Sequence, residues 1–298
     1  MDSPMLQPAE VAVAIIQQAL AKHNTRYDKI FVKAVLAGVI LSFSGLLDFI
    51  VQGGSPTLTS TNPGIVKLLG GFVFPVGLVA IALQGFELLT SNLMIFPVAV
   101  LNGSLPWWSI PTNWVIVFFG NLCGSLFCAA ILAKGDGLVV ADPYATYIRN
   151  FAVTRAVTPS WYQIFLKSIG CNWLVCIGFW QATGARETIS KIVSLWLPIW
   201  AFVTCGFDHM VVNMFKITLG IMLRADLTPA YYIKKSLIAS FLGNLVGASF
   251  VGLPAVYFYF GASTSKREGL VNAEEGCANC KGQDNLISSG QSSVHVHP

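Results

Sequence analysis

Charged residues are scarce in this sequence. They make up 11% of its 298 residues, whereas hydrophobic residues make up 54%. An ordinary soluble domain of this length needs far more polar side chains to cover its surface, so the composition excludes that class of protein. We therefore expect a chain that folds in a lipid bilayer.

We also expect no cleavable signal peptide. The N-terminal segment lacks a basic start followed by a small-residue cleavage site, and the first apolar span begins only after Lys22, Arg26 and Lys29. That span is expected to insert into the membrane itself. Lysine and arginine are spread over loops and termini without a dense run, which gives no indication of nucleic-acid binding.

Cysteine gives no sign of a disulfide framework. Five of the seven cysteines lie in apolar spans, where a thiol behaves as a small buried hydrophobe. The other two, Cys277 and Cys280, form a C-x-x-C motif near His295 and His297 in the polar tail. These four side chains would form a zinc site if the tail folded back, but the surrounding composition favours disorder. We therefore expect no cofactor and no metal.

Six segments are apolar and long enough to cross a bilayer, for which a helix needs about 20 residues. They are residues 30–51, 68–101, 113–133, 161–181, 192–223 and 236–261. Six crossings put both termini on one side, which we expect to be the cytoplasmic side of the plasma membrane. Around a transport domain at residues 29–261, we predict an N-terminal surface helix within residues 1–28 and a disordered C-terminal tail at 262–298. A plain cytosolic helix is the alternative for the first segment.

The two halves of the chain carry three matching landmarks in the same order. These are Phe-x-Lys at 31–33 and 165–167, Gly-Phe-acid-x4-Asn at 85–92 and 206–213, and Gly-Asn-Leu at 120–122 and 243–245. Each half has three spans, an odd number, so the second copy must enter the membrane from the opposite side. The sequence thus predicts an all-α membrane protein with six transmembrane helices in two inverted three-helix repeats. Asn121 and Asn244 are predicted to bridge helices rather than to bind substrate.

The middle span of each repeat is interrupted, and the interruption starts at Gly85 or Gly206. Backbone outside a helix is tolerated at bilayer depth only around a cavity, so the two breaks are expected to meet near the midplane. Ionisable side chains are expensive there and normally face a pathway. The second break carries Asp208 and His209, and the repeat is expected to bring Thr90 close to His209. This pattern predicts a transport site.

Several separated motifs together resemble the formate/nitrite transporter family over residues 10–261. They are the broken second and fifth helices, Gly-Phe-Asp-His at 206–209, Cys-Asn-Trp-Leu-Val-Cys at 171–176 and the duplicated Gly-Asn-Leu. The termini and loops are similar to those of fungal nitrite transporters. The resemblance implies an aquaporin-like protomer with its own pore, a homopentamer, and a small inorganic or carboxylate anion and a proton as partners.

The resemblance also assigns roles to individual residues. Four match the family's substrate pathway and proton relay, namely His209, Thr90, Asn172 and Asn213. A fifth residue of this pathway, Asp208, stands where the family usually has glutamate. Four match positions that narrow the pore on the two sides of the histidine: Phe74, Leu78, Leu89 and Phe202. Lys22 matches a vestibule lysine, but the lysine expected in the other vestibule is Ala156, with Arg155 beside it. Whether Arg155 replaces that charge is left open by the sequence.

A small anion loses its water at the midplane, so it must meet fixed positive charge or accept a proton. Apolar constrictions favour the neutral acid, while a vestibule cation such as Lys22 raises the local concentration of the anion. We therefore predict proton-coupled transport of an anion, which the resemblance indicates is nitrite, and in which His209, or a water that it organises, delivers the proton. A passive histidine that only lines the pore is the alternative. Formate, acetate, lactate and hydrosulfide remain alternative substrates.

Two other classes of membrane protein are disfavoured. The paired Asn-Pro-Ala boxes of aquaporins are missing, which argues against a channel for neutral solutes. A redox enzyme that holds haem would need paired histidines inside the spans, where only His209 occurs. We therefore expect no enzyme activity, and the sequence does not separate a channel from a symporter.

Overall fold

The computed structural model describes residues 5–260; the C-x-x-C motif, the tail histidines and the segment predicted to be disordered lie outside these residues. The described part of the chain is helical. Its α-helices are α1 Pro8–His23, α2 Tyr27–Gly53, α3 Pro56–Thr61, α4 Pro63–Val73, α5 Val76–Gln84, α6 Leu89–Leu101, α7 Ser109–Phe127, α8 Tyr144–Ala156, α9 Trp161–Gly184, α10 Thr188–Cys205, α11 Met210–Met222, α12 Pro229–Tyr232 and α13 Ile238–Phe260. Two π-helical turns, η1 Cys128–Gly135 and η2 Ile233–Leu237, extend α7 and precede α13.

Within these residues, six helical segments are long and apolar enough to cross a membrane. They are Tyr27–Gly53, Pro63–Gln84, Ser109–Gly135, Trp161–Gly184, Thr188–Cys205 and Pro229–Phe260. The shorter apolar helices α6 and α11 complete the second and fifth segments. The predicted fold class is therefore confirmed. The second and sixth segments begin earlier than predicted, at Pro63 and Pro229, because proline fits the first turn of a helix, where no backbone donor is required.

Both interrupted segments break in the same way. The backbone turns into the left-handed region at Gly85 (φ 66°) and Gly206 (φ 76°), which ends α5 and α10. Glycine adopts this conformation without steric cost, and it is the usual residue just after a helix. The chain then extends up to Leu88 and His209, the residues that precede the first turns of α6 and α11.

A buried asparagine from the third helix of each repeat holds the corresponding break. Nδ2 of Asn121 donates to the backbone oxygen of Glu87 at 2.9 Å, and its Oδ1 accepts from the backbone N–H of Leu89 at 3.0 Å. Asn244 does the same for the other break. Its Nδ2 donates to the Asp208 oxygen at 3.2 Å, and its Oδ1 accepts from the Met210 N–H at 3.0 Å. Both asparagines bridge helices, as the sequence predicts, and they satisfy backbone groups that the breaks expose.

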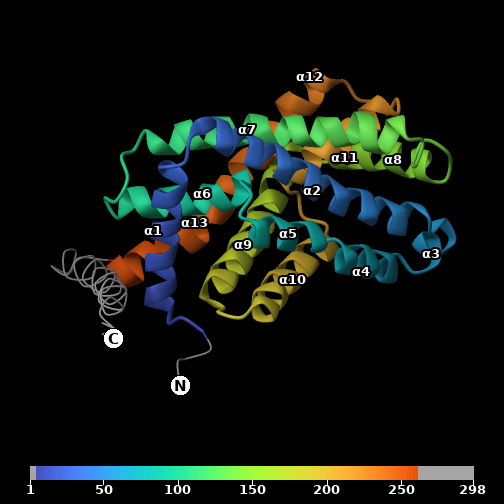
Figure 1. Cartoon of the computed structure of the whole chain (residues 1–298). Coiled ribbons are helices and arrows are strands. Elements are labelled where there is room, and N and C mark those ends of the chain that lie inside the picture. The colour runs from blue at the N-terminus through green and yellow to red at the C-terminus, as the bar shows by residue number, and fades with distance from the viewer. Residues whose placement is uncertain (1–4, 261–298) are drawn as a thin grey trace, which may run out of the picture. The chain divides into compact units, whose positions relative to one another are not determined.

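A helix outside the six segments precedes each repeat and packs on its second half-helix. α1 contacts α6 and α9, and α8 contacts α11; Figure 1 shows α8 lying along α11 and α1 crossing near α6. The face of α1 that makes this contact is apolar and buried: Val11, Ala12, Ile15, Ile16 and Ala19. Packing therefore fixes the basic ends of α1 and α8 beside the two breaks.

Candidate functional site

The two breaks meet at Thr90 and His209. Thr90 lies in the first turn of α6, and His209 immediately precedes α11. Oγ1 of Thr90 is 3.1 Å from Nε2 of His209. The exposed fractions of these residues are 0% and 2%, so the contact lies deep in the protein. The structure thus brings together the two residues that the inverted repeat predicts to be neighbours.

The backbone of α11 selects the tautomer of His209. The N–H of Val212 donates to Nδ1 of the ring at 3.2 Å, so Nδ1 must be unprotonated. The proton of the neutral ring then lies on Nε2 and is donated to the Thr90 hydroxyl. A second proton on Nδ1 would face another donor and would break this hydrogen bond. His209 is therefore held as a neutral ring with its N–H directed at Thr90.

Two aromatic rings pack on one side of His209. Phe202 stacks on the imidazole, with ring centroids 5.9 Å apart and 24° between the ring planes. Phe74 meets Phe202 edge to face at 5.9 Å. Leu78 and Leu89 are fully buried but lie outside the linings of the cavities described below. Of the four residues predicted to narrow the pore, Phe74 and Phe202 line the cavity that reaches His209.

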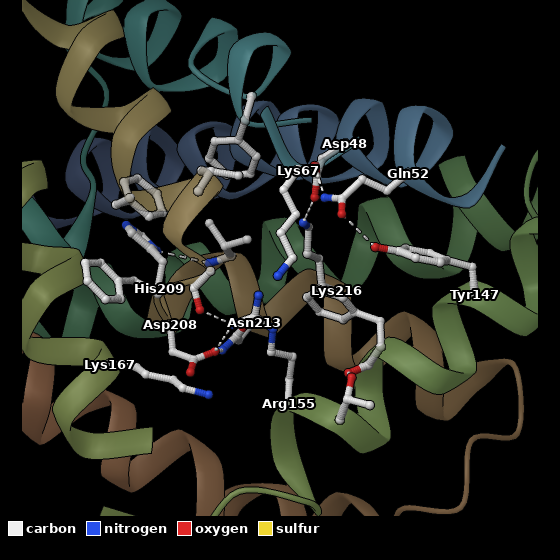
Figure 2. Close-up of a pocket in the computed structure, with 18 residues that line it drawn as sticks. Asp48, Gln52, Lys67, Tyr147, Arg155, Lys167, Asp208, His209, Asn213 and Lys216 are labelled. Atoms are coloured by element: carbon white, nitrogen blue, oxygen red, sulfur yellow. Dashed lines mark hydrogen bonds and ion pairs between the residues drawn. The ribbon is translucent and has the colours of Figure 1, made fainter. Parts of the chain in front are cut away.

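The cavity that these rings line, here named the α8 vestibule, has a volume of about 270 Å³. Figure 2 shows that its polar side chains come from several helices. Its basic and acidic lining residues are Lys67, Arg155, Lys167, Lys216, Asp48 and Asp208. His209 and Asn213 also line it, so the cavity reaches from the protein surface to the central histidine.

A second cavity of about 360 Å³, the α1 vestibule, lies against the first break. Its charged lining residues are Lys22, Lys33, Lys191 and Glu87. Lys33 and Lys167 are the matching lysines of the two repeats, and each lines its own vestibule. The predicted vestibule lysine, Lys22, therefore belongs to a larger basic entrance.

Each break contributes one acid. A cation from the helix that precedes the same repeat, α1 or α8, pairs with it. Nζ of Lys22 on α1 lies 2.7 Å from Oε2 of Glu87. A guanidinium nitrogen of Arg155 on α8 lies 3.3 Å from Oδ1 of Asp208 and also donates to the backbone oxygen of Gly206. Arg155 thus contacts the second break in the way that Lys22 contacts the first.

The predicted pathway amides have different surroundings. Nδ2 of Asn213 lies 3.4 Å from Oδ1 of Asp208, at the wall of the α8 vestibule. Asn172 lines neither cavity. Its Nδ2 donates to the backbone oxygens of Thr90 at 3.1 Å and Asn244 at 2.8 Å, while its buried Oδ1 has no partner among the described residues. Asn172 therefore positions Thr90 and leaves a free acceptor beside it.

Sequence reasoning missed one ion pair of the α8 vestibule. Nζ of Lys216 on α11 donates to Oδ2 of Asp48 on α2, and both residues are buried. The sequence does show both residues as candidates, because an ionisable residue inside an apolar span is a candidate functional residue. It does not show that they pair, since the two positions are 168 residues apart.

Comparison with known proteins gives concordant matches. The family model described as formate/nitrite transporter matches residues 9–259. A probable formate transporter of Methanothermobacter thermautotrophicus is 36% identical over 274 residues, which cover 87% of this chain and 98% of the relative. A formate channel of Bacillus thuringiensis is 32% identical over 249 residues, covering 83% and 93%. A solved structure described as a pentameric formate channel with formate bound has a TM-score of 0.69 and 29% identity, and the match covers 78% of this chain and 98% of that one.

Proposed function

This chain belongs to the formate/nitrite transporter family, and we propose that it carries nitrite together with a proton through a pore centred on His209 and Thr90. The observation that supports this most is the buried contact between these residues, placed between two basic vestibules. Formate is the second candidate substrate, because two relatives that are 36% and 32% identical to this chain are described as a probable formate transporter and a formate channel. Acetate, lactate and hydrosulfide are further small ions of weak acids that suit the same chemistry.

Capture of the anion is the first step. Two lysines in each vestibule, Lys67 and Lys167 on one side and Lys33 and Lys191 on the other, have no ion-pair partner among residues 5–260. Unpaired cations in a cleft with low-dielectric walls concentrate anions at its mouth. Figure 2 shows the side chains of Lys67 and Lys167 extending into the α8 vestibule. A weak-acid anion is therefore enriched at either entrance.

Neutralisation is the second step. The apolar rings of Phe74 and Phe202 give a hydrated anion no replacement for its water, so its charge must be removed before it passes. His209 holds its single ring proton toward Thr90, and we assign the proton transfer to a water ordered by these two groups. The water gives one proton to the anion, and the hydroxide left behind takes a proton from the solution in the entry vestibule, which restores the water. The neutral acid then crosses and releases its proton on the other side. Net transport is one anion with one proton.

Uptake into proteoliposomes tests this proposal. Nitrite influx and lumenal pH are followed together at two external pH values, with formate and acetate as competitors. Saturable influx that acidifies the lumen and accelerates at lower external pH is expected, because protonation precedes passage. Nitrite influx without movement of protons would contradict the proposed coupling. Uptake of formate in preference to nitrite would show that formate, not nitrite, is the preferred substrate.

A homopentamer in the plasma membrane, with both termini in the cytoplasm, is the assembly that we propose. The solved structure with a TM-score of 0.69 is described as pentameric. A groove between α7 and α13 is lined entirely by apolar side chains, among them Trp114, Phe118 and Phe241, which suits contact with lipid or a neighbouring protomer. Native mass spectrometry of the purified protein should give a mass of five chains, and a monomer would contradict this assembly.

A further inference from the structure

Lys216 and Asp48 form an ion pair that the transport steps above do not use. The two residues are 4% and 1% exposed, and both line the α8 vestibule. Figure 2 shows the ammonium group of Lys216 directed at the carboxylate of Asp48. A buried ion pair rarely stabilises a fold more than apolar residues of similar size would. Its presence in a pathway therefore points to a function other than stability.

The first observation is the position of Lys216 along α11. His209, Asn213 and Lys216 follow one another at intervals of four and three residues, so they lie on one face of the helix. Lys216 lies about 10 Å along the helix axis from His209, on the vestibule side. An anion that moves inward from the α8 vestibule meets this ammonium group before it reaches the histidine.

The second observation is that aromatic rings surround the ammonium group. Nζ of Lys216 lies 4.9 Å from the ring centroids of both Phe49 and Phe151 and 5.5 Å from that of Phe74. Such contacts stabilise a desolvated cation. Because Phe74 also packs on Phe202, the charge lies next to the two rings that are predicted to narrow the pore.

The third observation is that the pair occurs in one repeat only. Lys216 lies ten residues after Gly206, and the residue ten after Gly85 is Ile95. Asp48 lies fifteen residues after Lys33, and the residue fifteen after Lys167 is Ala182. Ile95 and Ala182 both line the α1 vestibule, so the repeat packs at these positions without charges. The fold does not require the pair.

Asp48 has its own support. Its Oδ1 accepts from Nε2 of Gln52 at 2.5 Å, and Oε1 of Gln52 accepts from the Tyr147 hydroxyl at 3.0 Å. The carboxylate is therefore held in place when Lys216 turns toward another acceptor. An ammonium group has three N–H donors, and Asp48 is the acceptor of its one hydrogen bond within residues 5–260.

We propose that Lys216 is a substrate-binding residue on one side of the pore, and that its ammonium group, oriented by Asp48, binds the incoming small monovalent anion outside the Phe74–Phe202 constriction. This inference rests on the proposed function, because it assumes that the anion enters through the α8 vestibule. The unpaired Lys67 and Lys167 balance the charge of the anion while it is bound there. At the matching positions, the α1 vestibule has the apolar residues Ile95 and Ala182 and so lacks this binding site.

The test compares three variants with the unchanged protein. Lys216→Met alone strands the Asp48 carboxylate, so the decisive variant is Asp48→Asn with Lys216→Met, which removes both charges and keeps the side-chain volumes. Lys234→Met makes the same change at a lysine that lines neither vestibule. Two quantities are measured: the KM for nitrite and formate in oriented proteoliposomes, and the line broadening of 13C-formate by the purified protein.

In the double variant, the KM from the α8 side should rise roughly tenfold, the loss expected for one hydrogen bond to a charged group, while the maximal rate stays within about twofold. Broadening of 13C-formate should fall, and Lys234→Met should change neither quantity. An unaltered KM and unaltered broadening in the double variant would show that the pair is only structural. If the unchanged protein transports no anion, the proposed function fails, and the broadening experiment still decides whether Lys216 binds one.

Discussion

The two vestibules are built from the same repeated parts, yet within residues 5–260 only the α8 vestibule is lined by an ion pair in which both residues are buried. In each vestibule, the acid of the break pairs with a cation from the helix that precedes the repeat: Glu87 pairs with Lys22 of α1, and Asp208 pairs with Arg155 of α8. Each also has two unpaired lysines. Asp48 and Lys216 line the α8 vestibule alone.

Net charge does not distinguish the two entrances. Four basic and two acidic residues line the α8 vestibule, whereas three basic and one acidic residue line the α1 vestibule, so each carries a net charge of +2. Long-range attraction of an anion should therefore be similar from both sides. We therefore expect both entrances to attract anions alike, and we expect the added pair to change what an anion contacts after it has entered the α8 vestibule.

The largest effect is expected where the repeats are most alike. Asn121→Leu and Asn244→Leu each remove the side chain that satisfies the backbone of one break and leave buried polar groups without partners. Each change should lower the free energy of unfolding by about 3 kcal/mol or more. Thermal unfolding in detergent measures this, with Asn150→Leu on the outer side of α8 as a control. Loss at only one of the two sites would contradict the structural equivalence of the breaks.

The shared centre should respond next. Thr90→Val keeps the shape of the side chain but removes the partner of Nε2 of His209 and leaves a buried donor unpaired. Transport from both sides should fall about tenfold or more, in keeping with the loss of a buried hydrogen bond at the reacting group. Thr90→Ser, which retains the hydroxyl, is the matched control. A selective loss from one side would show that His209 and Thr90 do not serve both vestibules equally.

The sequence was sufficient to place this centre but not the vestibules. Repeated glycines and an odd number of spans per half predict where the breaks lie and that Thr90 meets His209. The partner of Arg155 follows from how α8 packs on α11, which no local pattern specifies. Leu78 and Leu89, which the resemblance places at the narrow part of the pore, line neither cavity, and their role there stays a prediction. Asp48 and Lys216 could be noticed as charges in apolar spans, but only the fold pairs them.

The unpaired lysines allow the two entrances to be separated. Lys67→Gln with Lys167→Gln should slow uptake from the α8 side about fivefold at low salt, and Lys33→Gln with Lys191→Gln should do the same from the α1 side. Each double variant is the control for the other. Initial rates are measured in oriented proteoliposomes at 10 mM and at roughly 1 M ionic strength, where the Debye length falls from about 30 Å to 3 Å. A rate loss that salt does not reduce would mean that these lysines act by direct contact rather than by long-range attraction.

The smallest effect, and the sharpest test of the comparison, is a transfer of the pair. Ile95→Lys with Ala182→Asp would place the charges of the α8 vestibule at the matching positions of the α1 vestibule. If the pair forms an anion-binding site, the KM for uptake from the α1 side should fall about two- to threefold. The cost of burying two charges limits this gain in affinity. Ile95→Met with Ala182→Asn supplies the bulk without the charge and should leave the KM unchanged. A lower KM in both variants would attribute the tighter binding to altered packing. A lower KM in the charged variant alone would show that the ion pair makes an entrance bind its anion more tightly.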